Sequence, residues 1–443
     1  MTGVSSIRWR LVWLLVLISV VRSMDAVNFS VAAKQIMPEY GLTEVQIGVL
    51  YSVYLLGYAA FHLPGGVLAD VLGPRKLLGA ALVWWSVFTA LTAVAPQVPG
   101  LSLLGPFAAF LVVRFFIGLA EGACYPGSTR LLASWMAPDE RASSGGLVLS
   151  GMGIGYAITP PIVAFLMVQY GWRVSFYMFA FIGIGLAIRW YTYVTDEPET
   201  HPQISPQELQ HIRGDNPRLT SAADAIIPWR RLLTNTNVWL LGSAGFCMGY
   251  GVFLYQAWFY LYLVNERGFS ELGGGMFATG PFIAVALLGP VGGIWSDALV
   301  RRYGRKYGRR AGAIVGLVLS AVCAGIGATA ADPYVAIVLL SLGDGFLYMS
   351  AASAFATIID IGGPYTGVTY GFANIMTILG GVLAPTLTPI LANRFGWEVA
   401  IYVMVFLTLV GALVWLRIDA SKPVVLDTAE LAPLPVQDQP APE

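Results

Sequence analysis

The sequence predicts an all-α membrane protein with twelve transmembrane helices in two pseudo-symmetric six-helix halves. The first observation is composition: 57% of the 443 residues are hydrophobic and only 11% are charged, whereas a soluble domain carries about 25% charged residues. The second is a series of apolar stretches, each near the ~20 residues that cross a bilayer. The third is an internal repeat that relates the two halves of the chain.

The apolar stretches follow one another along almost the whole chain. We expect membrane spans at 11–35, 45–70, 76–95, 104–128, 142–168, 173–194, 237–264, 272–298, 311–331, 333–359, 367–392 and 398–417. Glycine and proline are abundant, with 50 and 26 residues, and membrane helices tolerate both because neighbouring helices satisfy the freed backbone groups.

Two separate segments of the chain match later segments at nearly the same offset. GVLYSVYLLGYAAFHLPGGVLAD (48–70) aligns with GMFATGPFIAVALLGPVGGIWSD (275–297), and YGWRVSFYMFAF (170–181) aligns with FGWEVAIYVMVF (395–406). In a transporter, parallel six-helix repeats of this kind place the substrate site at the midplane between the halves. We therefore expect an N-terminal half over 1–194, a linker over 195–236, a C-terminal half over 237–417 and a disordered, proline-rich tail over 418–443.

The basic residues are distributed unevenly over the predicted loops. Of the 25 Lys and Arg residues, only Lys34, Arg173, Arg267 and Arg394 fall in the loops on one side, and most of the others fall in the loops and tails on the opposite side. By the positive-inside rule, both termini face the cytoplasm. The protein is predicted to be a multi-pass protein of a bacterial inner membrane.

Several classes of function are excluded by what the sequence lacks. The three cysteines lie inside spans, and no His, Cys, Asp or Glu spacing is typical of a metal site, so neither a metal nor a cofactor is expected. The basic run RRYGRKYGRR (301–310) fits a cytoplasmic loop better than a nucleic-acid site. The expected partners are a small-molecule substrate, protons and the lipid bilayer, with no nucleic acid and a monomeric chain.

The segment GGVLADVLGPRK (65–76) resembles the signature loop of the major facilitator superfamily, and GGIWSDALVRRYGRK (292–306) stands where that family repeats it. The resemblance implies that Asp70, Arg75 and Asp297 act as a gate latch on the cytoplasmic side. The alternative is that this is only a basic loop that sets topology.

Further motifs narrow the resemblance to one branch. RFFIGLAEGACYPGSTRLLASWMAPDERASSGG (114–146), YGWRVSFYMFAFIG (170–183), DEPETHPQISPQEL (196–209) and AWFYLYLVNERGFS (257–270) are similar to the anion:cation symporter family. That family carries sugar acids, hexuronates, dicarboxylates and aromatic acids, usually with protons. A sister group that exchanges organic phosphates shares much of the pattern.

Charged residues inside the spans are the candidate site, since charge in a bilayer is costly and tends to mark function. Arg114 and Glu121 lie seven residues apart on one helical face, and the family pattern implies that Glu121 carries a proton and that Arg114 organises charge or binds substrate. A static ion pair that fixes helix packing is the alternative.

Asp25 matches an acidic family position, which implies a second proton carrier, but the arginine that follows it in the family is Ala26 here. Arg22 lies one turn before position 26 and could supply the missing charge to the substrate. Alternatively, Arg22 only neutralises Asp25.

Asp344 is a third buried carboxylate and has no acidic counterpart in the family. It could carry a proton, select a cationic or zwitterionic substrate, or pair with an arginine. Tyr58 and Asn374 match family substrate positions. Aromatic and amide residues on the seventh span, which serve either packing or binding, complete the predicted substrate site: Tyr255, Gln256 and Trp258.

The sequence thus predicts a proton-coupled symporter that imports a small organic anion. An exchanger or exporter of organic phosphates or non-anionic compounds is the alternative, motivated by Ala26 and Asp344. A membrane sensor would need a folded domain outside the membrane, and an enzyme would need a catalytic constellation; the sequence shows neither.

Overall fold

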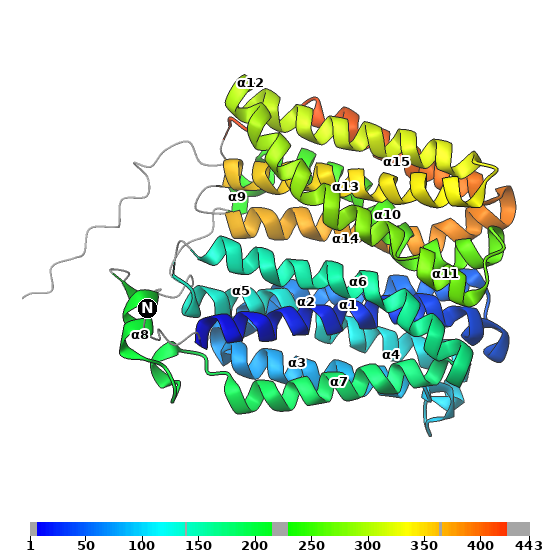
Figure 1. The fold of residues 1–443 in the computed structure, drawn as a ribbon, viewed down its shortest axis with the longest axis horizontal. Helices are drawn as coiled ribbons and strands as arrows, with labels where there is room; N and C mark the ends of the chain where they lie inside the picture. The colour runs from blue at the N-terminus through cyan, green and yellow to red at the C-terminus, as the bar shows by residue number, and fades with distance from the viewer. Residues whose placement is uncertain (1–6, 138–139, 215–228, 363–365, 423–443) are drawn as a thin grey trace, which may run out of the picture.

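The structure is a computed structural model, and it describes residues 7–137, 140–214, 229–362 and 366–422 (Figure 1). The first half contains α1 (Ile7–Tyr40), α2 (Glu44–Leu72), α3 (Pro74–Thr92), α4 (Gly105–Glu121), α5 (Cys124–Trp135), α6 (Arg141–Tyr170) and α7 (Trp172–Tyr193). The second contains α10 (Thr236–Leu261), α11 (Glu271–Phe277), α12 (Gly280–Thr329), α13 (Pro333–Gly362), α14 (Thr366–Phe395) and α15 (Trp397–Trp415). Between them lie α8 (Pro206–Arg213) and α9 (Trp229–Thr234).

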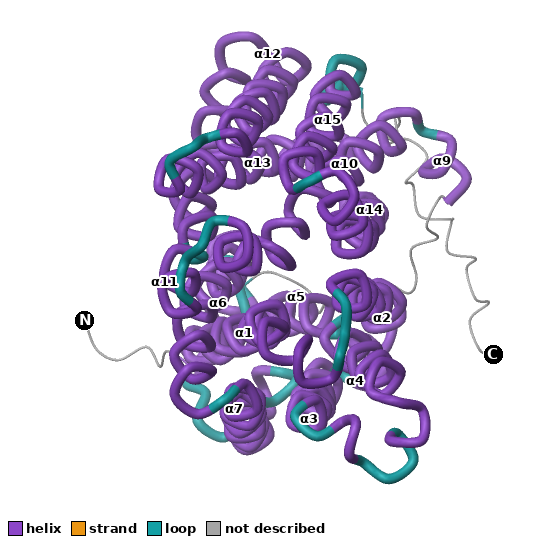
Figure 2. Tube along the Cα trace, turned by 90° about the vertical axis from the view of Figure 1, so that its right-hand side faces the viewer, coloured by secondary structure: helices purple, strands orange, loops and turns teal. Residues whose placement is uncertain are grey.

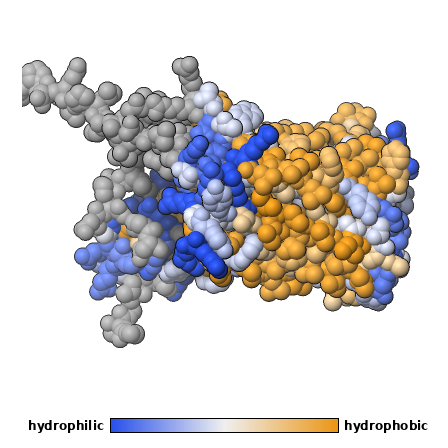
Figure 3. Space-filling model, turned by 90° about the horizontal axis from the view of Figure 1, so that it is seen from above, coloured by the Kyte–Doolittle hydropathy of each residue, from blue (hydrophilic) through white to orange (hydrophobic). Residues whose placement is uncertain are grey.

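Most of the long helices in the described part of the chain are apolar enough to span a bilayer. Ten stretches meet that criterion by length and composition. One of them, Glu271–Thr329, reverses direction at Gly304, where φ is +78°, so it contains two crossings. The 19-residue α3 packs lengthwise against α4 and α7 as a further crossing. The prediction of an all-helical, twelve-span protein is confirmed, and Figure 3 shows the apolar band between two polar ends.

The fourth span differs from the continuous helix that the sequence predicts. It consists of α4 and α5, which are separated at Gly122 and Ala123, directly after Glu121. Pro126 has no N–H to donate to the carbonyl four residues earlier, which weakens the helix at this point. The interruption leaves Glu121 at the carboxyl end of α4, at the level of the buried charges described below.

The internal repeat appears in the structure as matching local geometry. Gly171 and Gly396 have nearly the same left-handed conformation, with φ of 82° and 89°, and each precedes a helix that begins at tryptophan. Gly48 and Gly275 occupy equivalent positions at contacts between the halves. A Cβ on Gly48 would lie 2.0 Å from the Pro385 carbonyl oxygen of α14.

The equivalent position in the other half is equally tight, because a Cβ on Gly275 would lie 2.4 Å from the Ala164 side chain and 2.9 Å from the Pro160 carbonyl oxygen of α6. The α2–α14 and α11–α6 contacts therefore form a pseudo-symmetric pair, and they join the two groups of helices in Figure 2.

We call the end of the bundle that carries α8, Gly73 and Gly304 the linker end, and the opposite end the far end. At the far end, polar contacts cross between the halves. Lys34 donates to the Asn265 side chain at 2.6 Å, and Gln35 donates to Glu271 at 3.3 Å. The Ser52 hydroxyl of α2 donates to the Val382 carbonyl of α14 at 2.6 Å. The two halves are thus held together at the far end.

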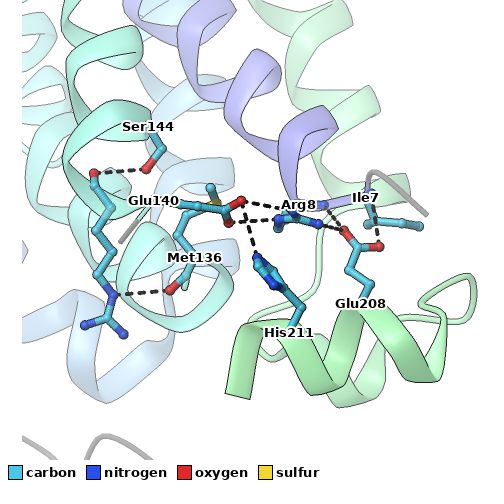
Figure 4. A network of polar contacts seen from close by, with 8 residues as sticks. Ile7, Arg8, Met136, Glu140, Ser144, Glu208 and His211 are labelled. Atoms are coloured by element: carbon cyan, nitrogen blue, oxygen red, sulfur yellow. Dashed lines mark hydrogen bonds and ion pairs between the residues drawn. The ribbon is translucent and has the colours of Figure 1, made fainter. Parts of the chain in front are cut away.

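At the linker end, α8 is fastened to the N-terminal half (Figure 4). The buried Glu208 accepts hydrogen bonds from the backbone N–H groups of Ile7 and Arg8 and so caps the start of α1. Arg8 also forms a two-pronged pair with Glu140, at 2.9 and 3.0 Å. His211 of α8 lies 3.4 Å from Glu140. The hydrogen bond from Arg8 is the main cause that lowers the pKa of Glu140.

The predicted domain boundaries stay a prediction. The segment 215–228 within the predicted linker and the segment 423–443 of the predicted disordered tail lie outside the described residues. The described part of the linker contains the short helices α8 and α9, which the sequence did not predict.

Candidate functional site

The centre of the N-terminal half contains a buried ion pair between α1 and α4. Nε of Arg22 lies 3.0 Å from Oε2 of Glu121, and these side chains are 6% and 0% exposed. The Tyr54 hydroxyl of α2 donates to the same carboxylate oxygen at 2.5 Å. Oε1 of Glu121 has no hydrogen-bond partner. The carboxylate is therefore held on one side and open on the other.

Tyrosines from three other helices surround the Arg22 guanidinium. Nη1 donates to the Tyr156 hydroxyl of α6 at 3.3 Å, and Nη2 donates to the Tyr54 hydroxyl at 3.4 Å. The Tyr58 ring lies 4.8 Å from Cζ and the Tyr125 ring 5.7 Å from it. These contacts stabilise the cation without a second negative charge.

Close helix packing brings α2 and α4 into this arrangement. A Cβ on Gly118 would lie 2.0 Å from the Tyr54 carbonyl oxygen, and one on Gly122 would lie 2.6 Å from that of Tyr58. Only glycine permits this approach of two helices in a membrane. As a result, Tyr54 and Tyr58 stand directly beside the charges of α4.

Arg114 is fully buried on α4 but has a different environment from Arg22. Its Cζ lies 4.4 Å from the Tyr54 ring and 4.6 Å from the Phe29 ring. Nε and Nη2 have no hydrogen-bond partner. A buried guanidinium with free N–H groups has donors ready for an anion. The alternative, a static ion pair between Arg114 and Glu121, does not match the structure, because Glu121 forms its ion pair with Arg22.

Asp25 lies on α1, 3% exposed, and neither of its carboxylate oxygens has a hydrogen-bond partner. Thr89 of α3 is a nearby potential donor that is itself without a partner. The interpretation that Arg22 merely neutralises Asp25 does not match the structure, in which Arg22 pairs with Glu121. The buried centre of the N-terminal half therefore holds two guanidinium groups and two carboxylates, and the Arg22–Glu121 ion pair joins one of each.

The C-terminal half holds one buried carboxylate. Asp344 on α13 is 2% exposed, and its Oδ1 has no partner. Tyr348, one turn further along α13, is within electrostatic range of Asp344 and also of Arg22, Tyr125 and Tyr156 in the other half. Tyr348 thus lies between the charges of the two halves.

The other predicted substrate residues are placed as follows. Tyr58 lies over Arg22, and Gln256 is buried on α10. The indole N–H of Trp258 donates to the Pro385 carbonyl at 3.0 Å, so its polar atom is used in packing. Nδ2 of Asn374 lies 3.5 Å from His62 Nε2 at the α2–α14 contact. The predicted roles of these residues remain untested.

The predicted latch residues lie at the linker end, and each forms contacts within its own half. Nε of Arg130 lies 2.9 Å from Asp70, and Nη1 of Arg309 lies 2.6 Å from Asp297. The side chain of Arg75 donates to the Tyr191 carbonyl at 2.7 Å. The latch role stays a prediction.

Tyr54, Tyr125 and Tyr156 are site residues that the sequence analysis missed. Only Tyr54 has a signal in the sequence, because Tyr51, Tyr54 and Tyr58 recur at helical intervals on one face; Tyr125 and Tyr156 have none. In a chain with 21 tyrosines, that signal is weak. In the described part of the chain, no group of three or more His, Cys, Asp or Glu residues could hold a metal ion.

Two six-helix halves with opposite charges buried at their centre define a secondary transporter of the membrane, not an enzyme. The comparisons agree: the chain belongs to the Major Facilitator Superfamily, whose family model matches residues 15–307 and 272–440. It is a multi-pass integral membrane protein.

Two curated relatives and one solved structure illustrate the similarity. The chain is 32% identical over 398 residues to a probable sulfoacetate transporter, SauU, of Cupriavidus necator, covering 89% of this chain and 90% of the relative. It is 30% identical over 386 residues to a hexuronate transporter of Bacillus subtilis, covering 86% and 87%. A bacterial homolog of the human lysosomal transporter Spinster, inward-facing and unoccupied, has the same fold, with TM-score 0.77, 16% identity and coverage of 95% and 98%.

Proposed function

We propose that the protein imports a small organic anion, such as a sugar acid, a dicarboxylate or an aromatic acid, by symport with protons. It would work in a bacterial inner membrane with both termini in the cytoplasm. The observation that carries the proposal is the buried Arg22–Glu121 ion pair beside Arg114, whose Nε and Nη2 have no hydrogen-bond partner. The relatives named as sulfoacetate and hexuronate transporters support the choice of an organic anion.

The geometry suggests how substrate and proton would be coupled. An anion that reaches Arg114 also approaches Arg22, and it competes with Glu121 for that guanidinium. Once Arg22 turns to the substrate, Glu121 is a buried carboxylate without its counter-charge, which favours its protonated form. Proton uptake then accompanies anion binding because both depend on Arg22.

Asp25 is the second proton site in this proposal, with Asp344 as the third predicted one. The Asp25 carboxylate is buried inside a membrane span, and an acidic residue in that position is typical of a proton relay. Arg22 then fills the role that the family assigns to the arginine that is Ala26 in this chain. Tyr58, Tyr255, Gln256, Trp258 and Asn374 would contribute to the walls of the substrate site.

The orientation proposed here places the linker end in the cytoplasm, because most of the loop arginines and lysines lie there. With the far end joined by the Lys34–Asn265 and Gln35–Glu271 contacts, the structure then corresponds to a state closed toward the outside. Alternating access would require these contacts to break and the linker end to close, with Asp70, Arg75 and Asp297 as its latch.

The test is uptake into proteoliposomes that contain the purified full chain. Radiolabelled sulfoacetate, glucuronate and galactarate are each offered with an inward proton gradient, with an inward sodium gradient, and with no gradient. We expect one of these anions to accumulate only with the proton gradient. Accumulation driven by sodium alone would contradict proton symport. Counterflow exchange without any response to a gradient would contradict it too and would favour the exchanger alternative.

A further inference from the structure

The C-terminal half contains a second group of buried polar atoms without partners. The group consists of Oδ1 of Asp344, Oγ of Ser341 and the Tyr255 hydroxyl. Ser341 and Asp344 lie three residues apart on α13 and so share a face of that helix. The Tyr255 hydroxyl of α10 lies against the adjoining face of α13, because a Cβ on Gly343, the residue before Asp344, would be 3.0 Å from it. We call these three side chains the α13 acceptor group.

Each member of the α13 acceptor group is buried, with 2%, 7% and 3% exposure for Asp344, Ser341 and Tyr255. A buried polar atom without a hydrogen bond costs about 1–3 kcal/mol. A buried polar atom without a partner in the protein calls for an explanation, and a ligand that supplies the missing hydrogen bond is one. The arrangement is therefore a candidate binding site and not merely a packing feature.

The charge of the α13 acceptor group differs from that of the N-terminal cluster. In the described part of the chain, no hydrogen bond or ion pair reaches Asp344, whereas the N-terminal carboxylates lie close to Arg22 and Arg114. An anionic substrate group would meet a like charge at Asp344, and such a juxtaposition costs several kcal/mol. A positively charged group would supply the missing counter-charge.

The number and type of polar atoms point to one chemical group. A primary ammonium has three N–H donors and no acceptor. The carboxylate of Asp344 and the hydroxyl oxygens of Ser341 and Tyr255 are three acceptors. A substrate hydroxyl would bring only one donor, and a second carboxylate would bring none.

Within the class of organic anions, we propose that the substrate also carries an ammonium group and is thus a zwitterion. Its anionic end would be bound by Arg114 and Arg22 and its ammonium end by Asp344, with Ser341 and Tyr255 at the neighbouring faces of α13 as further acceptors. Tyr348 lies between the two binding regions, within electrostatic range of both Asp344 and Arg22. This inference rests on the proposed function, because it assigns the anionic end to the same N-terminal cluster. It makes Asp344 a specificity residue, in place of the proton-carrying role predicted from the sequence.

The test compares substrates that differ only in the group at the end remote from the anion. One series is taurine, isethionate, ethanesulfonate and sulfoacetate; the other is γ-aminobutyrate, γ-hydroxybutyrate, butyrate and succinate. Binding to the purified full chain is measured by titration calorimetry at pH 7, where the amines are charged. We expect the ammonium member of at least one series to bind about tenfold or more tightly than the dianionic member, a difference of about 1.4 kcal/mol.

Variants then assign the preference to Asp344. Asp344→Asn should abolish the preference, because the ammonium member should bind about tenfold or more weakly and the dianion more tightly. Asp344→Glu should retain part of the preference. Tyr255→Phe should cause a smaller loss because one acceptor of three is removed. The matched control is Asp332→Asn, the same change at the exposed start of α13, where an asparagine can still cap Tyr334 and Val335. It should leave the preference unchanged.

Four results would overturn the inference. The ammonium site would be contradicted if a dianion bound as tightly as its ammonium analogue, or if the ratio of the two affinities were unchanged in Asp344→Asn. Neither result would contradict the proposed transport of an organic anion. Binding of ethanolamine without binding of any anion would overturn both the inference and the proposed function. If no member of either series binds, the small zwitterion is ruled out as the substrate.

Discussion

The centre of the N-terminal half brings two guanidinium groups and two carboxylates together, while the centre of the C-terminal half places the buried carboxylate of Asp344 near hydroxyl groups. Both halves share the same backbone plan, down to the matching glycines at Gly48 and Gly275. A repeated fold thus carries two different electrostatic sites. The charged N-terminal site is suited to couple an anion to a proton, and the C-terminal site is suited to discriminate between substrates.

The largest expected effect comes from breaking the Arg22–Glu121 pair. Arg22→Ala leaves Glu121 without its counter-charge, and removing one partner of a buried pair costs about 3–5 kcal/mol. We expect a marked fall in melting temperature together with loss of anion binding. The double variant Arg22→Met/Glu121→Gln should recover most of the thermal stability, since neither charge stays buried alone, but not the binding.

The matched comparison in the other half is Asp344→Asn, which breaks no ion pair in the described structure. Its melting temperature should change much less than that of Arg22→Ala. Equal destabilisation by the two changes, measured by thermal unfolding of the purified proteins, would contradict the distinction between the two halves.

The second prediction tests the glycine contacts that the two halves share. Gly48→Ala and Gly275→Ala should both open the far end, because a Cβ would lie 2.0 Å from a backbone oxygen or 2.4 Å from a side-chain carbon. Spin labels at the exposed positions Tyr170 and Tyr334 would report a longer distance. Gly66→Ala is a control on the same helix as Gly48, since a Cβ there would meet only one atom, at 4.0 Å.

The third prediction concerns the latch residues at the linker end. Asp70→Asn should weaken closure of the linker end and shift the population toward states that are open there. Asp297→Asn should have the smaller effect, because Arg309 keeps a second carboxylate, Asp360, at 3.0 Å. Distances between spin labels across the linker end test both changes, and an unchanged distribution in Asp70→Asn would show that it is not a latch.

The fourth and smallest effect concerns the attachment of α8 to the N-terminal half. The pair with Arg8 lowers the pKa of Glu140 in the folded protein. The pair therefore stabilises the fold fully at pH values above the pKa of a glutamate in the unfolded chain, which is about 4.3. That stabilisation is lost as the pH falls through the folded pKa. Melting curves from pH 7 to about pH 2.5 should therefore decline less steeply for Glu140→Gln than for the wild type. Glu266→Gln, the same change at an exposed far-end position, should follow the wild-type curve.

Most of the fold could be predicted from the sequence because membrane spans and repeats leave local signals. The Gly171 and Gly396 helix starts, for example, follow from two similar strings of residues. The break after Glu121 was not predicted, since hydrophobicity continues through it and only Pro126 marks it. The helices α8 and α9 were missed because they lie in a polar segment read as a linker.

The candidate site was predictable only in part. Arg22, Asp25, Arg114, Glu121 and Asp344 stand out because a charge inside an apolar span is conspicuous. Their partners were not predictable: Arg22 pairs with a residue 99 positions away and not with its neighbour Asp25. Sequence spacing identifies contacts along one helix, whereas this pair depends on how α1 packs against α4.

The central claim is that substrate and Glu121 compete for Arg22, so that anion binding draws a proton into the protein. The most direct measurement is the number of protons taken up on substrate binding, obtained by titration calorimetry in buffers with different ionisation enthalpies. We expect close to one proton per bound substrate in the wild type and none in Glu121→Gln, with binding retained in that variant. Substrate binding without proton uptake in the wild type, or with undiminished uptake in Glu121→Gln, would contradict the account.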